Sequence, residues 1–352
     1  MKIVIVAGGT GGHIYPGLAI AEEIKRREPD SSILFIGSEE GLENELIGRE
    51  GYNLVLIRAR AWLRKLSYKA LSAPFVSAIG FFQALRILKS FSPEIILSTG
   101  GYASLPVVLA GKLLGIPVFL QEQNVLPGAV NRFCHRFAKK TLLAFDESLP
   151  YLTGEVVGNP VRRKIREASK AAALKNLKLP QDKKIVLIMG GSQGSKKINE
   201  TVISAIESVP PGLFILHLIG NRDYAWVSRY LNGKKIDNYR ALPYLHDMAD
   251  ALAAADLVIS RAGATAIAEF LVRGLPMILI PFPYAAEDHQ RLNARVIGQK
   301  GGAIMVEDAV FTPQKFIEIL GQAGLDYAKM KAACLSLARP EAAEKIVDLI
   351  YG

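Results

Sequence analysis

Residues 2–12 read KIVIVAGGTGG, and residues 184–194 read KIVLIMGGSQG. Each segment begins with a run of mostly β-branched apolar residues that is long enough for a buried strand, and each continues into a glycine-rich turn. A helical pattern follows both turns, and the first helix is expected to start near Pro16. A strand, a glycine turn and a helix in this order, present twice in one chain, predict two similar Rossmann-like halves.

A second pair of similar segments follows, one after each member of the first pair. Residues 94–121 (EIILSTGGYASLPVVLAGKLLGIPVFLQ) resemble residues 256–281 (DLVISRAGATAIAEFLVRGLPMILIP). Strands alternating with helices predict the α/β class with parallel sheets. The turn at Gly158-Asn159-Pro160 interrupts this alternation, so we expect domains at 1–158 and 159–339. The tail at 340–352 is expected to form a short amphipathic helix that packs on either half.

Composition excludes some classes of protein but does not select one. The chain has 352 residues with a formal charge of +10, which favours an anionic partner without separating nucleic acid, lipid and phosphorylated substrate. No nucleic-acid-binding signature accompanies the basic residues, so a nucleic-acid binder is disfavoured. The only cysteines, Cys134 and Cys334, stand far apart, which argues against a disulfide framework or a zinc site and fits a reducing cytoplasm. The N-terminus reads as a first strand rather than as an export signal.

The first glycine loop, Gly8 to Gly12, is followed by His13. Glycines allow backbone amides to approach a ligand closely, and a helix N-terminus adds a positive end, so we expect a phosphate here. A dinucleotide fingerprint is disfavoured because Ile14 occupies the position of its last glycine. An imidazole at this place can accept a proton from a hydroxyl group, although a structural role for His13 in capping the helix explains the residue equally well.

The second glycine loop, Gly190 to Ser195, predicts a diphosphate cradle. An NTPase is disfavoured because Met189 stands where the G-x-x-x-x-G-K motif requires its first glycine. Further on, Arg261 to Thr265 opens a helix that carries Glu269, whose carboxylate is suited to two ribose hydroxyls. Polar residues that suit sugar hydroxyls then follow a strand: Asp288, His289, Gln290 and Asn293.

Two groups of residues end strands in the first half and are expected at the same cleft. These are Gly100 to Ser104, which includes Tyr102, and Gln121 to Asn124. Glu122 is interpreted as a ligand of an acceptor sugar or as a base, and a buried structural carboxylate is the competing account. No D-x-D pair occurs in the sequence, so a metal-bridged nucleotide site is not indicated, and basic loops and helix ends are expected to neutralise a leaving diphosphate.

Residues 61–91 mix large apolar side chains with cations. The composition is typical of a patch that inserts shallowly into an anionic membrane surface, and a core-packing helix is the alternative. The residues assigned to this membrane patch are Trp62, Leu63, Arg64, Lys65, Lys69, Phe75, Ile79 and Phe82.

Taken in order, the motifs resemble those of glycosyltransferase family 28, in the GT-B group of inverting enzymes. They run from GGTGGH (Gly8 to His13) through GGYAS (Gly100 to Ser104), EQN (Glu122 to Asn124), GNPVR (Gly158 to Arg162), GGSQGS (Gly190 to Ser195) and RAGAT (Arg261 to Thr265) to DHQ (Asp288 to Gln290). The resemblance implies two Rossmann-like domains whose parallel sheets face an interdomain cleft. It also implies transfer of N-acetylglucosamine (GlcNAc) from UDP-GlcNAc to the 4-hydroxyl of the lipid-linked acceptor lipid I, with inversion, which forms lipid II for peptidoglycan synthesis.

The resemblance further implies roles for residues at matching positions. The acceptor is expected at Thr10, His13, Tyr102, Glu122 and Asn131, with His13 as first candidate for the general base and Glu122 as second. The donor is expected at Thr10, Gly11, Gly12, Asn124, Arg162, Ser192, Gln193, Leu245, Arg261, Thr265, Glu269, Gln290 and Asn293, with Arg162 at the interdomain hinge. No cofactor is expected, and the location implied is the cytoplasmic face of the cell membrane, beside other cell-wall synthesis proteins.

Two positions depart from the family pattern. Gln121 stands where many members carry histidine, so that position is not expected to supply the base. Ala266 lacks a hydroxyl that some relatives have, which leaves more of the phosphate binding to Thr265 and backbone amides. Two other functions remain open at this point: a UDP-GlcNAc 2-epimerase with the same fold, and a non-catalytic membrane adaptor.

Overall fold

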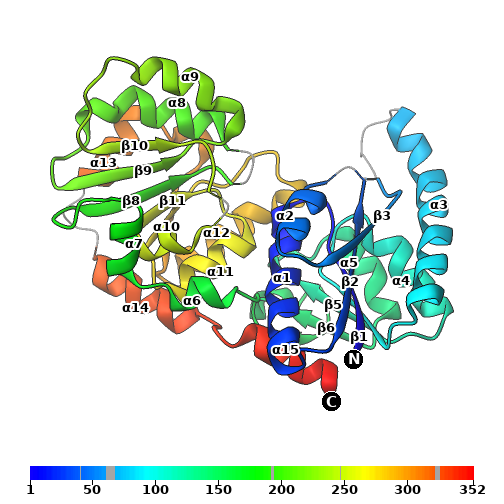
Figure 1. The fold of residues 1–352 in the computed structure, drawn as a ribbon. Helices are drawn as coiled ribbons and strands as arrows, with labels where there is room; N and C mark the ends of the chain where they lie inside the picture. The colour runs from blue at the N-terminus through cyan, green and yellow to red at the C-terminus, as the bar shows by residue number, and fades with distance from the viewer. Residues whose placement is uncertain (40, 61–67, 192–193, 246, 322–325) are drawn as a thin grey trace. The chain divides into compact units, whose positions relative to one another are not determined.

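The computed structural model describes residues 1–39, 41–60, 68–191, 194–245, 247–321 and 326–352, with the backbone alone for residues 68–74. The chain divides into two compact units. Unit 1 comprises Met1–Arg162 together with Arg339–Gly352, and unit 2 comprises Arg163–Ala338. Each unit is a parallel sheet covered by helices on both faces (Figure 1).

Unit 1 contains a seven-stranded sheet in the order β3-β2-β1-β4-β5-β6-β7, with every pair of neighbours parallel. The strand order reverses direction beside β1, which is the point where open α/β sheets bind their ligands. The elements of unit 1 are β1 (Lys2–Val6), α1 (Gly11–Arg27), β2 (Ser32–Ser38), α2 (Glu43–Arg49), β3 (Asn53–Ile57), α3 (Tyr68–Phe91), β4 (Ile95–Ser98), α4 (Ser104–Leu113), β5 (Val118–Glu122), α5 (Ala129–Cys134), β6 (Lys140–Leu143), β7 (Glu155–Val156) and α15 (Ala342–Tyr351).

Unit 2 repeats the plan with a six-stranded parallel sheet in the order β10-β9-β8-β11-β12-β13. Its order reverses direction beside β8, the strand that the sequence echo matches to β1. The elements of unit 2 are α6 (Arg163–Glu167), α7 (Lys170–Asn176), β8 (Lys184–Met189), α8 (Lys196–Ala205), β9 (Leu213–Leu218), α9 (Asn221–Leu231), β10 (Tyr239–Leu242), α10 (Ala249–Ala254), β11 (Leu257–Ser260), α11 (Ala264–Val272), β12 (Met277–Leu279), α12 (His289–Gln299), β13 (Ala303–Met305), α13 (Pro313–Gly321) and α14 (Tyr327–Leu337).

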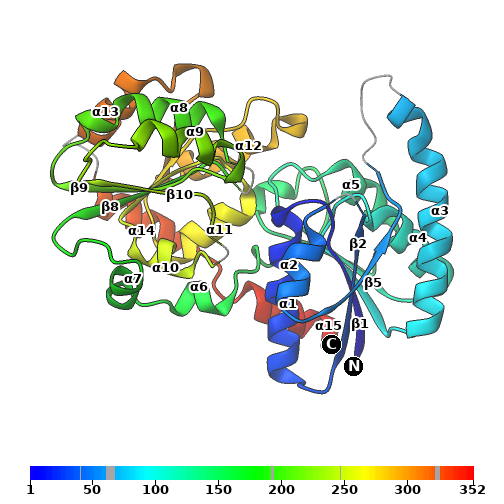
Figure 2. The ribbon, with the colours of Figure 1, turned by 45° about the horizontal axis from the view of Figure 1, so that its top comes forward.

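The strands of unit 1 carry continuous rather than alternating apolar residues, so both faces of the sheet must be covered. The core of the unit accordingly lies on both faces. One face packs against α1, α2 and α15, and the other against α3, α4 and α5, as Figures 1 and 2 show. Ile346, Val347 and Ile350 of α15 join the first of these clusters. The C-terminal tail therefore packs on the first half of the chain, which the sequence had left open.

The first helix begins at Gly11 and not near Pro16, so the expectation for its start is wrong. Its first turn forms because the Thr10 carbonyl oxygen accepts hydrogen bonds from the amides of His13 and Ile14. Pro16 is accommodated inside the helix near its start. Among the described residues, no helix is both long and apolar enough to cross a bilayer.

Candidate active site

The first glycine loop of unit 1 lies between the end of β1 and the start of α1, at the carboxyl edge of the sheet. Gly9 has φ +90°, a conformation that favours glycine. Its amide donates to Glu43 Oε1 at 2.9 Å, and the same oxygen accepts from the Ser38 amide at 2.7 Å and the Ser38 hydroxyl at 2.8 Å. Glu43 is fully buried, so this carboxylate ties the glycine loop to the end of β2.

Sequence reasoning missed Glu43. The nearest signal is the pair of glycines that make room for its side chain, since a Cβ at Gly37 would lie 2.5 Å from Glu43 Cγ and one at Gly41 would lie 1.8 Å from its Oε2. Such a contact joins segments that only the folded chain brings together, and no local pattern encodes it.

His13 is half-buried in the first turn of α1, and its Nδ1 atom has two acceptors. The Thr99 carbonyl oxygen lies 2.8 Å from Nδ1, and Gln123 Oε1 lies 3.0 Å from it. Because both partners accept, Nδ1 must carry the proton in the neutral ring, and Nε2 then presents its lone pair. The arrangement holds the tautomer that a general base needs.

The loop after β4 leaves room for the His13 ring and contacts it. Gly100 has φ +102°, and a Cβ there would lie 2.8 Å from His13 Nδ1. The Thr99 hydroxyl donates to the His13 carbonyl at 2.8 Å, and Gln123 Nε2 donates to the Thr99 carbonyl at 2.6 Å. His13 is therefore positioned by the ends of β4 and β5.

Glu122 is only 1 % exposed, and its carboxylate is fully engaged. One oxygen accepts from the amide and the side chain of Asn124, and the other accepts from the Gly128 amide at 3.0 Å and from Asn131 Nδ2 at 2.8 Å. These bonds close the loop between β5 and α5. The geometry favours the structural alternative for Glu122 over contact with an acceptor.

The remaining predicted residues of unit 1 differ in exposure. Thr10 and Gly12 are exposed, Gly11 is buried, and Tyr102 is 47 % exposed beside Gly9. Arg162 lies elsewhere in the unit: its guanidinium donates to both carboxylate oxygens of Glu50 and contacts Glu22 at 3.5 Å. Burial alone would lower the pKa of Arg162, but the hydrogen bonds and charges of these carboxylates raise it, so this side chain is held within unit 1.

In unit 2, Arg261 braces the loops at the carboxyl ends of four strands. It is 8 % exposed, and it donates to the Ser195 hydroxyl at 2.8 Å, to the Ile280 carbonyl at 3.1 Å and to the Pro281 carbonyl at 3.2 Å. It also pairs with Asp308 at 2.6 Å. The sequence predicts Arg261 near a phosphate, and in the structure its contact with Ser195 holds the end of the glycine loop after β8.

Gln290 and Asn293 fasten the segment before α11. Gln290 Oε1 accepts from the amides of Ala262 and Phe282, and the buried Asn293 donates to the Ala262 carbonyl at 3.2 Å. The structure thus brings Arg261, Gln290 and Asn293 together around one loop.

Other predicted donor residues lie on or near the same edge of the sheet. Thr265 is buried in the first turn of α11, Glu269 is half-buried in the next, and Leu245 is half-buried after β10. Ser192 and Gln193 lie outside the described residues. Among the residues that the structure does describe, no group of three or more His, Cys, Asp or Glu could hold a metal ion.

Three of the predicted membrane residues lie on α3 and have described side chains. Phe75 is 77 % exposed, Ile79 43 % and Phe82 68 %. Their helical spacing puts them on one face, while Gly80, Ala84 and Leu88 are buried against the unit. Trp62, Leu63, Arg64 and Lys65 lie outside the described residues, and the Lys69 side chain is not described.

Two Rossmann-like units, each a parallel sheet with a glycine loop at its carboxyl edge, define the GT-B class of fold. Residues 3–143 match the N-terminal domain of glycosyltransferase family 28, and residues 185–346 match its C-terminal domain. A protein from Thermoanaerobacter sp. (strain X514), named UDP-N-acetylglucosamine--N-acetylmuramyl-(pentapeptide) pyrophosphoryl-undecaprenol N-acetylglucosamine transferase, is 38% identical over 360 residues, which cover 99% of each chain. This chain belongs to glycosyltransferase family 28.

One solved structure agrees with this assignment, and a second shares the fold. The crystal structure of MurG from Acinetobacter baumannii matches with a TM-score of 0.77 at 28% identity over 99% of both chains. A UDP-GlcNAc 2-epimerase from Neisseria meningitidis, bound to UDP-GlcNAc, matches over 100% of both chains with a TM-score of 0.66, but at 14% identity it shares the fold alone.

Proposed function

We propose that this protein transfers GlcNAc from UDP-GlcNAc to the 4-hydroxyl of the muramyl sugar of undecaprenyl-pyrophosphoryl-MurNAc-pentapeptide, lipid I, with inversion, and so forms lipid II. The observation that carries the proposal is the orientation of His13, whose Nδ1 is committed to two acceptors while Nε2 is left to act as a base. Full-length similarity to a protein named for this reaction supports it.

In the proposed reaction, unit 1 binds the acceptor and unit 2 binds the donor. His13 Nε2 takes the proton of the 4-hydroxyl as that oxygen forms a bond to the anomeric carbon of GlcNAc. The bond from this carbon to the β-phosphate oxygen breaks, and UDP leaves from the opposite side, which accounts for inversion. His13 is preferred over Glu122 as the base because the Glu122 carboxylate already accepts four hydrogen bonds.

The donor diphosphate is proposed to lie at the loop after β8 and at the first turn of α11. Charge on the departing UDP would be stabilised by backbone amides and by a helix N-terminus, which are already oriented before the reaction begins. Arg261 contributes by holding Ser195 and the strand ends in place. On this account the reaction requires no divalent cation.

The protein is proposed to work at the cytoplasmic face of the cell membrane, attached by the exposed face of α3. Phe75, Ile79 and Phe82 would enter the interface, and Arg86 and Lys89, exposed further along the helix, would meet anionic headgroups. Such attachment would bring unit 1 to its lipid-linked substrate.

The test is release of UDP from UDP-GlcNAc with and without a short-chain lipid I analogue, in the presence of EDTA. Release that depends on the acceptor and persists in EDTA is expected. Conversion of UDP-GlcNAc to UDP-ManNAc without acceptor would favour the epimerase, and tight binding of UDP-GlcNAc without turnover would favour the adaptor. Loss of transfer in EDTA would contradict the metal-free mechanism.

A further inference from the structure

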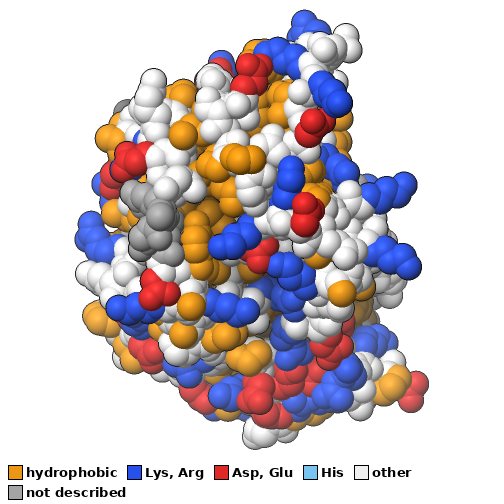
Figure 3. Space-filling model, turned by 90° about the vertical axis from the view of Figure 1, so that its left-hand side faces the viewer, with side chains coloured by type: hydrophobic (Ala, Val, Ile, Leu, Met, Phe, Trp, Pro, Cys, Tyr) orange, Lys and Arg blue, Asp and Glu red, His pale blue; other side chains and the backbone are white. Residues whose placement is uncertain are grey.

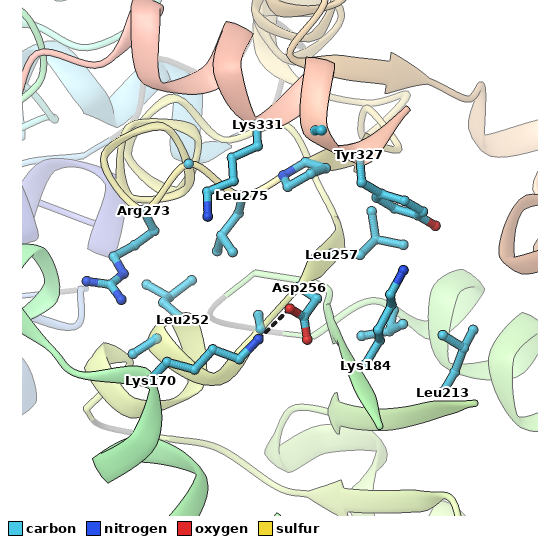
Figure 4. Close-up of a pocket in the computed structure, with 16 residues that line it drawn as sticks. Lys170, Lys184, Leu213, Leu252, Asp256, Leu257, Arg273, Leu275, Tyr327 and Lys331 are labelled. Carbon is cyan, nitrogen blue, oxygen red and sulfur yellow. Dashed lines mark hydrogen bonds and ion pairs between the residues drawn. The ribbon is translucent and has the colours of Figure 1, made fainter. Parts of the chain in front are cut away.

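Unit 2 contains a pocket at the edge of its sheet opposite the glycine loop. The pocket has a volume of about 330 Å³ and is lined at the amino ends of the strands, by Lys184 of β8, Leu213 of β9, Leu257 of β11 and Pro276 before β12 (Figure 4). Because β8 spans six residues at about 3.3 Å per residue, this edge lies roughly 15–20 Å from the loop after β8. The pocket is therefore separate from the proposed donor site.

Four cations line this pocket, with a single carboxylate. Lys170 pairs with Asp256, whose second oxygen accepts from the Ile185 amide at 2.9 Å. Figure 4 shows Lys331 pointing into the pocket from one side and Lys170 and Lys184 from the other, with Arg273 at its edge. The one carboxylate is thus already used by one of the four cations.

The other three cations have no carboxylate partner in the part of the chain that the structure describes. Lys184 Nζ lies 5.2 Å from the ring centre of Tyr327. Arg273 donates only to the carbonyl oxygens of Ile165 and Arg166, its Nε is buried without a partner, and burial lowers its pKa. Lys331 has no hydrogen bond or ion pair with any other described residue. Arg273 is half-buried, so its positive charge is costly unless an anion joins it, whereas Lys184 and Lys331 are exposed and can turn to meet such an anion.

The floor of the pocket is apolar. Apolar side chains of the sheet and of α10 line it, among them Val186, Leu252 and Leu257, together with Leu275. Hydrophobic side chains are also exposed among Lys and Arg side chains on the face of the molecule drawn in Figure 3. A ligand that satisfies both parts of the pocket must carry a negative group and an aliphatic body.

We propose that this pocket binds a phosphate ester of an aliphatic alcohol. A phosphate matches three uncompensated cations better than a monovalent carboxylate does, since it carries more charge and more acceptor oxygens. A sugar or nucleoside body fits less well because its hydroxyl groups need acceptors, and the only lining carboxylate, Asp256, has both oxygens engaged. The leucine side chains instead receive an alkyl or isoprenyl group.

The test is isothermal titration calorimetry of the full chain with geranyl monophosphate below its micelle concentration, in saturating UDP so that the donor site is filled. The pocket variant combines Lys184→Gln with Lys331→Gln. Its matched control combines Lys183→Gln with Lys329→Gln, which removes the same charge from neighbouring positions that do not line the pocket. Equal thermal midpoints of the two variants show that both are folded.

Binding by the wild type and by the control, weakened about tenfold or more in the pocket variant, is the expected result. Geraniol and inorganic phosphate should each bind much more weakly than the ester. Equal affinity of the two variants, absence of binding by the wild type, or equally tight binding of inorganic phosphate would each overturn the proposal.

Discussion

At the scale of single residues, His13 is held through one ring nitrogen by groups from two strand ends. The Thr99 carbonyl and the Gln123 side chain both act on Nδ1, so the ring can neither flip nor change tautomer without the loss of a hydrogen bond. Gln123 is itself buried and fixed to the same carbonyl oxygen. The proposed base is therefore positioned before any substrate binds.

His13→Ala is expected to lower kcat by about 10²- to 10⁴-fold, the usual contribution of a general base. Affinity for UDP-GlcNAc should stay unchanged, because His13 is assigned to the acceptor and is not among the residues expected at the donor. Steady-state kinetics and a separate binding measurement check the two parts. The control is His135→Ala, since within the described part of the chain the His135 ring bonds only to Thr141 and Thr153; a similar loss of kcat in both variants would refute the assignment.

Glu43 supports the glycine loop by accepting hydrogen bonds, and two substitutions can separate this role from the effect of its negative charge. Glu43→Gln keeps an oxygen that can accept from the Gly9 amide and from Ser38, whereas Glu43→Ala leaves these donors without a partner. We expect the alanine variant to lose about 1–3 kcal/mol of unfolding free energy and the glutamine variant less.

The same pair of variants tests whether the loop matters for function. Urea unfolding gives the stability, and kcat/KM measured on the fraction that remains folded gives the effect on activity. Glu43→Ala should lower kcat/KM while Glu43→Gln restores most of it. Equal behaviour of the two variants would mean that the oxygen acceptor is not what holds the loop.

At the scale of elements, β9 and α8 of unit 2 share a buried polar contact that makes the unit sensitive to acid. His217 is fully buried, and burial lowers its pKa to about 3. Its two nitrogens contact the Tyr239 hydroxyl at 3.0 Å and Asn199 Oδ1 at 3.1 Å. The folded state therefore keeps this ring neutral.

Because the unfolded chain protonates this histidine near pH 6.5 and the folded chain does not, acid favours unfolding. The stabilising contribution is fully present above pH 6.5 and declines as the pH falls toward 3. We expect unfolding of unit 2 in the full chain to cost about 2 kcal/mol less at pH 5 than at pH 7. Urea unfolding of His217→Gln should show a smaller pH dependence, and His289→Gln, which alters a half-buried histidine, should not.

The exposed face of α3 gives a second prediction at this scale. Phe75→Ser combined with Phe82→Ser should weaken binding to vesicles that contain anionic lipid by about tenfold or more, because two large apolar side chains no longer enter the interface. Cosedimentation measures binding, and Tyr230→Ser in unit 2, another exposed aromatic residue, is the control. Unchanged vesicle binding would contradict the membrane assignment.

The elements themselves were largely predictable, because buried parallel strands are continuous apolar runs and glycine turns punctuate them. The echo between residues 2–12 and 184–194 identified the central strands β1 and β8 and the turns that follow them. The start of α1 was misplaced because Pro16 was taken as a boundary, whereas the helix had already begun at Gly11.

Partners within the site could not be predicted in the same way. The contacts of His13 with Thr99 and Gln123, and of Arg261 with Asp308, join positions that are distant along the chain, and only sheet topology brings them together. Burial also changes the interpretation of a motif. Glu122 has the residue type of a base, but its hydrogen bonds to Gly128 and Asn131 use it to close a loop.

At the scale of the whole molecule, the two units place similar glycine turns in different surroundings. Unit 1 combines its glycine loop with an oriented imidazole, whereas unit 2 combines its own with a buried arginine that braces four strand ends. The C-terminal helix α15 returns to unit 1, where Asp348 pairs with Arg27 and the Tyr351 hydroxyl donates to Glu28. Family membership and these two sites together support a transferase that assigns acceptor and donor to separate units.

Analysis of the product tests the central claim most directly. The full chain is incubated with UDP-GlcNAc and a short-chain lipid I analogue in EDTA, and the lipid product is examined by mass spectrometry and NMR. We predict one added GlcNAc, β-linked to the muramyl 4-hydroxyl, as inversion of the α-linked donor requires. An α-linkage, attachment at another hydroxyl, or unmodified acceptor beside UDP-ManNAc would contradict the account.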